Sequence, residues 1–137
     1  MTNRLSDELE IRNVLAEVLW QADNAPIDAL DDYLDCFTAD AEWEMFGDVR
    51  KGHAALREGA EDRRRSGMMG PGTHVHHFLS CTVVTFISDD EARVKSYIQA
   101  YKGTPKDPSI FLMGQYFDEF RRSPAGWKLA KRVVVFE

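Results

Sequence analysis

The sequence predicts an α+β fold in which N-terminal helices pack over the concave face of a curved antiparallel sheet. Three observations lead to this prediction. Apolar residues of the N-terminal part recur at helical spacing, long runs of the C-terminal half are rich in β-branched and aromatic residues, and short polar turns join those runs. Strands joined in this way favour antiparallel pairing. With 137 residues, the chain is expected to form one domain, 1–137.

Two helices are expected to begin the chain. Ser6 is placed to cap the first, whose apolar residues share one face, and the breaker sequence Asn24-Ala25-Pro26 ends it near Asp23. Asp28 caps the second helix. Two-residue alternation over 40–46 then predicts a short strand.

A third helix is expected over 54–65, and it ends in the basic run Arg63-Arg64-Arg65. We interpret this run as a solvent-exposed face, with contact to an anionic substrate as the alternative. The Gly- and Met-rich segment 66–72 predicts a loop, which could form the lip of a pocket. Four long strands should follow, over 73–87, 92–101, 110–122 and 127–136.

Charge and hydropathy exclude several classes of partner. The formal charge is −6, and a nucleic-acid partner is not expected because phosphate binding needs a basic surface. No apolar run approaches the roughly 20 residues that span a bilayer, and the first ten residues lack the pattern of a signal peptide. We therefore expect a cytoplasmic protein that has no membrane partner.

The residue types that bind metals are present but not arranged as a metal site. Cys36 and Cys81 lie in segments expected to be buried and have no CxxC spacing, so free core thiols are expected. His74 and His76 share one face of the predicted strand, but a histidine pair at a strand start is more often structural. We expect no metal.

The most informative pair is His77 with Asp23. A carboxylate near a helix end and a histidine on an inward strand face are the minimal equipment for proton transfer, because an anion beside imidazole raises its basicity and fixes its tautomer. The alternative is that Asp23 only ends a helix and His77 is a hydrogen-bonded core histidine.

Motifs along nearly the whole chain resemble those of the SnoaL-like, nuclear transport factor two-like superfamily, which has cone-shaped α+β domains. They are Asp23 followed by Asp28-Ala29-Leu30, Phe37-Thr38-Ala39-Asp40-Ala41-Glu42-Trp43, Lys51-Gly52-His53-Ala54-Ala55-Leu56, Thr73-His74-Val75-His76-His77-Phe78, Gly114-Gln115-Tyr116 and Gly126-Trp127-Lys128-Leu129-Ala130-Lys131-Arg132. The superfamily includes ketosteroid isomerases, polyketide cyclases, scytalone dehydratase, bile acid dehydratase and hexachlorocyclohexane dehydrochlorinase. Because it contains many chemistries, the resemblance specifies the fold better than the reaction.

The resemblance implies roles for three residues. In the dehydratase and dehydrochlorinase members, a histidine of the first long strand is the general base and an aspartate at the end of the first helix orients it; by position these resemble His77 and Asp23. The dehydrochlorinase also has an arginine in its last strand that stabilises developing negative charge, which points to Arg132. The implied reaction is proton abstraction from carbon, with elimination of water or another leaving group.

The chain departs from scytalone dehydratase because 96–101 contains no second histidine. Tyr97 or Tyr101 could supply a hydroxyl instead, with packing as the alternative. Tyr116 is a further catalytic candidate. Asp118 shares its strand face, and we expect it to pair in solvent with a neighbouring arginine rather than to act as a second acid.

The expected pocket is apolar with a few polar groups, which suits an aromatic, polyketide or steroid-like ligand. Trp43, Phe78 and Tyr101 are the candidate substrate-binding residues. The leading hypothesis is a cofactor-independent lyase or isomerase of the dehydratase type. The alternative is a non-catalytic binding or assembly subunit that resembles the small subunit of ring-hydroxylating dioxygenases. A homodimer or homotrimer that forms through the sheet is expected in either case.

Overall fold

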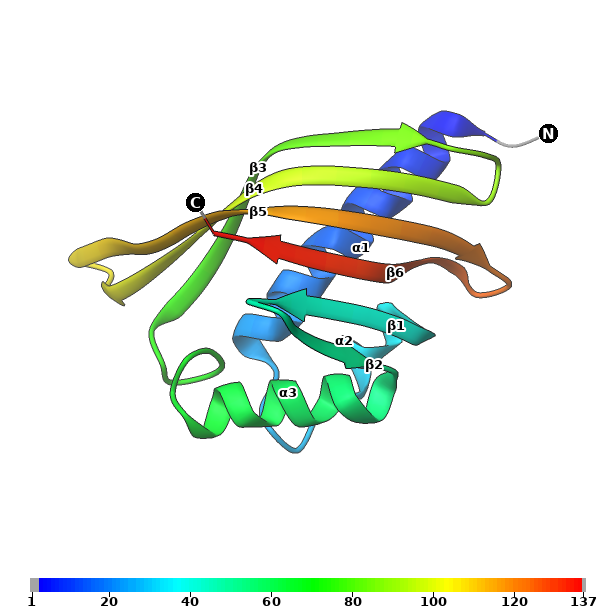
Figure 1. Ribbon diagram of the computed structural model, residues 1–137. Helices are drawn as coiled ribbons and strands as arrows, with labels where there is room; N and C mark the ends of the chain where they lie inside the picture. The colour runs from blue at the N-terminus through cyan, green and yellow to red at the C-terminus, as the bar shows by residue number, and fades with distance from the viewer. Residues whose placement is uncertain (1–2, 137) are drawn as a thin grey trace.

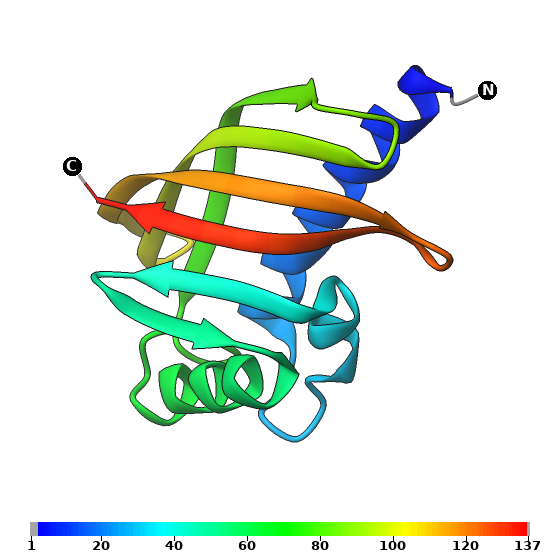
Figure 2. The same cartoon turned by 45° about the vertical axis from the view of Figure 1, so that its right-hand side comes forward.

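The computed structural model describes residues 3–136 (Figure 1). Three helices pack against one sheet, as the sequence predicts, and the sheet has six strands where the sequence predicts five. Figure 2 shows α1 lying across one face of the sheet, with α3 and the shorter α2 at the end where β1 and β2 lie. The helices are α1 (Arg4–Asn24), α2 (Asp31–Asp35) and α3 (His53–Arg65).

The sheet is mixed rather than purely antiparallel. Its strand order is β2-β1-β6-β5-β4-β3, and every neighbouring pair is antiparallel except β1 and β6, which run parallel. A helix and four other strands separate β1 from β6 in sequence, so the argument from short turns does not apply to this pair. The strands are β1 (Phe37–Met45), β2 (Asp48–Lys51), β3 (Val75–Phe86), β4 (Glu91–Thr104), β5 (Asp107–Ser123) and β6 (Gly126–Val135).

The core lies between α1 and the concave face of the sheet. The apolar stripe of α1 includes Ile11, Leu15 and Val18, which are almost completely buried, and it packs against strands that present Ile98 and Phe120. The burial pattern of β4 alternates strictly over residues 91–100, which is the period of a strand with one covered face. Residues that alternate with the buried ones therefore lie on the opposite, convex face.

Several local predictions are wrong for identifiable reasons. The side chain of Asn3, not of Ser6, caps α1, because Asn3 Oδ1 accepts the backbone N–H of Ser6 at 3.1 Å. Asp28 precedes α2 without capping it, since that helix begins only at Asp31. The strand β2 follows the Phe46–Gly47 turn and was not predicted. Cys36 is buried as expected, but Cys81 is exposed.

The β4–β5 hairpin extends beyond the rest of the sheet, as the yellow segment of Figure 1 shows. Gly103 lies in β4 just before the turn at 105–106 and has φ +120°, and an added Cβ would lie 2.4 Å from the carbonyl oxygen of Asp107. Within residues 3–136, no helix is both long and apolar enough to cross a membrane.

Candidate active site

Asp23 and His77 are in direct contact, although 54 positions separate them in sequence. Asp23 Oδ2 accepts the backbone N–H of His77 at 2.8 Å, and Oδ1 lies 2.6 Å from the ring Nδ1. The exposed fractions of the two side chains are only 7% and 6%. A carboxylate in this position favours the tautomer with the proton on Nδ1 and leaves Nε2 as the basic atom. In the part of the chain that the structure describes, Nε2 has no hydrogen-bond partner.

The segment that carries Asp23 is fixed by an arginine of another helix. The last turn of α1 has no basic residue of its own. Arg64 of α3 instead donates to the backbone carbonyls of Gln21, Ala22 and Ala25 at 2.9–3.0 Å. These carbonyls lie at the C-terminal end of α1, where intrahelical donors run out and the helix dipole also favours a cation; that of Gln21 in addition accepts the backbone N–H of Ala25. Arg64 therefore holds both sides of Asp23 in place.

His77 lines a cavity of about 60 Å³. Most of the wall is apolar, and the polar members are His77, Arg63 and Tyr116. This composition is typical of a small-molecule site, in which apolar walls supply affinity and a few polar groups supply orientation. The apolar members are Trp43, Met45, Met68, Met69, Ile98, Phe111, Leu112, Val134 and Phe136.

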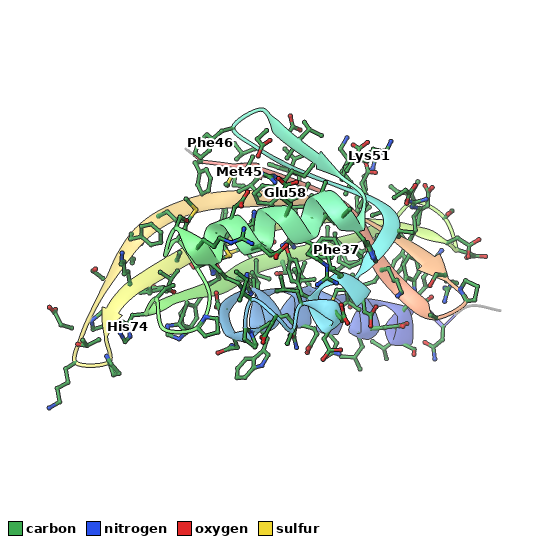
Figure 3. All side chains as sticks on the ribbon, turned by 90° about the horizontal axis from the view of Figure 1, so that it is seen from below. Phe37, Met45, Phe46, Lys51, Glu58 and His74 are labelled. Carbon is green, nitrogen blue, oxygen red and sulfur yellow. The ribbon has the colours of Figure 1, made fainter. Side chains whose placement is uncertain are left out.

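The inner cavity adjoins a second hollow of about 420 Å³, and all the residues that line it have apolar side chains. The two share part of their lining, and the outer hollow adds Phe46 and Met113. Figure 3 shows Met45 and Phe46 at the tip of the β1–β2 hairpin, and Phe46 stacks on Phe136 with 5.0 Å between ring centroids. Because methionine side chains adapt their shape easily, this Met-rich outer hollow can accommodate apolar ligands larger than the inner cavity.

Tyr116 joins the cavity to a buried ion pair. Burial raises the pKa of the Tyr116 hydroxyl to about 12, so the group stays protonated at neutral pH and can donate a hydrogen bond. The Arg132 guanidinium lies 3.8 Å from the centroid of its ring. Arg132 in turn donates two hydrogen bonds to Asp118, at 2.8 and 2.9 Å.

The surroundings of Arg132 and Asp118 differ from the sequence expectations. Arg132 lies behind Tyr116 and does not line the cavity that contains His77. Asp118 is completely buried with Arg132, so the expected solvent pairing with a neighbouring arginine is wrong. Arg121 pairs with Asp40 instead, and Arg122 pairs with Asp7 and Asp90. Burial raises the pKa of the Asp118 carboxyl, and Arg132 opposes that rise.

Three predicted site residues lie on the convex face, away from His77. On the paired strands β3 and β4, His77 is opposite the buried Ala100, whereas Phe78 and Tyr97 point to the other side and are 54% and 51% exposed. Tyr101 packs edge-on against Phe78, with 5.0 Å between ring centroids. The structure therefore brings Trp43 and Tyr116 to the cavity with His77, but not Tyr97, Tyr101 or Phe78.

Arg63 is the cavity residue that sequence reasoning interpreted as part of a solvent-exposed run. Of the three consecutive arginines only Arg65 is in that position, where it pairs with Glu61 and Asp62. The helical spacing of the apolar residues would have indicated which of the three arginines face inward. Leu56 and Ala60 define the buried stripe of α3, and positions 63 and 64 continue it at three- and four-residue spacing.

Comparison with known proteins agrees with the fold. Residues 3–133 match the family model described as a SnoaL-like domain. No curated protein matches the sequence. A protein of unknown function with a cystatin-like fold from Nostoc punctiforme is 22% identical, with a TM-score of 0.84 over 100% of this chain and 96% of that chain.

Two other similar structures carry provisional dehydratase descriptions. One, from Novosphingobium aromaticivorans, is described provisionally as a scytalone dehydratase; it is 22% identical, with a TM-score of 0.77 over 97% of this chain and 85% of that chain. The other, from Streptomyces avermitilis, is described provisionally as a dehydratase of the NTF2-like family; it is 15% identical, with a TM-score of 0.77 over 98% and 99%. At these identities the likeness concerns the fold.

Proposed function

Because this chain belongs to the SnoaL-like domain family, a fold that supports many chemistries, we propose its function from its own site: a cofactor-independent lyase or isomerase of the dehydratase type. The substrate is an apolar aromatic, polyketide or steroid-like molecule, and His77 removes a proton from one of its carbon atoms. The contact between Asp23 and His77 Nδ1 carries this proposal. The provisional dehydratase descriptions of two structures of the same fold indicate which reaction to test first.

In the proposed step, Nε2 of His77 takes the proton, and the electron pair of the broken C–H bond forms a double bond or an enolate. Asp23 keeps Nδ1 protonated and stabilises the imidazolium that forms. If a hydroxide leaves from the neighbouring carbon, the proton on Nε2 returns to it as water. Tyr116 is suited to donate a hydrogen bond to the oxygen on which negative charge develops.

A second candidate function is binding without catalysis. It is favoured by the inner cavity of about 60 Å³, which is small beside the apolar outer hollow of about 420 Å³. A binding or assembly subunit would use the apolar walls and leave the histidine as a structural group. The two functions are distinguished by whether ligand protons exchange with solvent, because mere binding leaves carbon-bound protons in place.

The test is proton exchange in D2O, followed by NMR, for a panel of aromatic and steroid-like β-hydroxy ketones. Formation of a conjugated enone is followed in parallel by ultraviolet absorbance. We expect His77→Gln and Asp23→Asn to slow exchange by about 10²- to 10⁴-fold, the usual contribution of a general base. Arg65→Met, which removes an exposed charge near the site, should retain the wild-type rate. Exchange that persists in His77→Gln would refute the assignment of the base.

A further inference from the structure

Arg63 differs from its two neighbours because no acceptor in the described part of the chain pairs with its guanidinium group. Arg64 donates four hydrogen bonds to backbone carbonyls, and Arg65 forms ion pairs with Glu61 and Asp62. The side chain of Arg63 has neither an ion pair nor a hydrogen bond to residues 3–136, and its Nε atom is buried without a partner. A buried donor that remains unpaired costs free energy, so its retention calls for an explanation.

The position of Arg63 supplies a functional explanation. Its guanidinium lies 4.6 Å from the ring centroid of Trp43, and both residues line the cavity that contains His77. The stacking on a mostly buried indole restricts the arginine to the cavity wall. Arg63 is also the one lining residue with a permanent charge, and no carboxylate is among the twelve residues that line the cavity.

The neighbouring acidic groups are engaged by other cations. Asp62, one residue before Arg63, pairs with Arg65 and lies 3.9 Å from Arg50. Arg50 itself pairs with Asp48 at 3.1 Å. Gly59 allows this crowding, because a Cβ there would lie 2.9 Å from the Arg50 side chain and 3.1 Å from Arg63. Within residues 3–136, these carboxylates therefore do not pair with the guanidinium of Arg63, which lines the cavity.

We propose that Arg63 binds a carboxylate of the ligand, so that the substrate is an apolar organic acid rather than a neutral molecule. This inference rests on the proposed function, because only that function makes the ligand a substrate. The observations on Arg63 do not depend on the role of His77. The planar guanidinium presents a fork of N–H donors that matches the two oxygens of a carboxylate, and such charge-assisted bonds are the strong ones. The ligand would pair the buried Nε–H that the protein leaves unpaired.

The binding test uses two probes of nearly the same shape, 2-naphthoate and uncharged 2-naphthamide, measured by isothermal titration calorimetry at pH 8. Wild type should bind the naphthoate more tightly. Arg63→Met keeps the aliphatic stem and should weaken naphthoate binding by about 10- to 100-fold while leaving naphthamide binding unchanged. Arg65→Met is the matched control: it removes the same charge from the same helix and should change neither affinity.

Three results would overturn the proposal: an equal loss of both probes in Arg63→Met, an unchanged preference in that variant, or no preference for naphthoate in wild type, including no binding of either probe. Arg63→Lys separates charge from shape, because it should recover part of the preference without the forked geometry. If the exchange assay, repeated with β-hydroxy ketones that carry a carboxylate, fails while the wild type still prefers naphthoate, the lyase is rejected and the carboxylate site is retained.

Discussion

Removal of the Arg132 charge should destabilise the protein strongly, because Arg132 and Asp118 form a completely buried pair. Their side chains are 3% and 0% exposed, and two hydrogen bonds join them. Arg132→Met keeps the aliphatic stem but leaves the Asp118 carboxyl buried and uncompensated. Breaking a buried pair from one side costs about 3–5 kcal/mol, which is a large share of the stability of a typical domain.

The chain offers a matched control for this experiment in the exposed pair of Arg121 and Asp40, whose side chains are 43% and 63% exposed. Arg121→Met should cost much less than Arg132→Met, because solvent screens the exposed pair. The free energy of unfolding is measured by urea denaturation followed by circular dichroism. A shift of the denaturation midpoint reports a change in stability when the slope of the free energy against urea concentration is unchanged.

The double variant Asp118→Leu with Arg132→Met identifies the cause. It removes both charges and should recover most of the stability lost in the single variant, since an apolar pair of similar volume is often as stable as a buried ion pair. It also provides folded protein if Arg132→Met alone does not fold. A single-variant cost as small as that of Arg121→Met would refute the structural role of Arg132, and an equally unstable double variant would refute the uncompensated charge as its cause.

Three further predictions concern other parts of the molecule. The Arg122 contact lowers the pKa of Asp7, so the stabilisation that Asp7 provides should be present at pH 7 and lost below about pH 4. The measurement compares the free energy of unfolding of Asp7→Asn with that of wild type across this pH range. A difference in free energy that stays constant with pH would contradict the prediction. Burial raises the pKa of the Cys36 thiol to about 11, so iodoacetamide at pH 8 should label only the exposed Cys81 in the native state. Both thiols should be labelled after unfolding. Labelling is detected by mass spectrometry, and labelling of Cys36 in the native protein would contradict the prediction. We propose that the convex sheet face joins two or three copies of the chain, so Phe117→Glu should reduce the sedimentation coefficient; a wild type that is monomeric at micromolar concentration would contradict this.

The residues alone make Asp23 and His77 candidates for a pair, because each sits at a recognisable boundary, but they leave open the alternative that both are structural. Asp23 is followed by a breaker sequence that ends a helix, and His77 lies near the start of a long strand rich in β-branched residues. The family resemblance then connects the two positions. The structure adds what no local pattern contains, namely that Asp23 also accepts the backbone N–H of His77.

The wrong placements arise from strand faces and strand register, which local sequence does not specify. Tyr97 and the buried Ile98 are adjacent, and exchanging the two faces of one strand moves every side chain to the opposite side of the sheet. Alternation of small and apolar residues with charged ones along β4 identifies its covered face, and that pattern would have placed Tyr97 outside. The pairing of Asp118 with Arg132 depends on the register of β5 against β6, which places the two residues directly opposite each other.

The three consecutive arginines of α3 show how helical geometry gives neighbouring identical residues different surroundings. Successive side chains are rotated by about 100° around the axis. Arg63 therefore reaches the cavity, Arg64 reaches the carbonyls beside Asp23, and Arg65 remains with surface carboxylates. The last turn of α3 thus contacts both the proposed carboxylate site and the segment that holds the Asp23 carboxylate. The proposed carboxylate site and the support of the Asp23–His77 pair therefore depend on adjacent residues of the same helical turn.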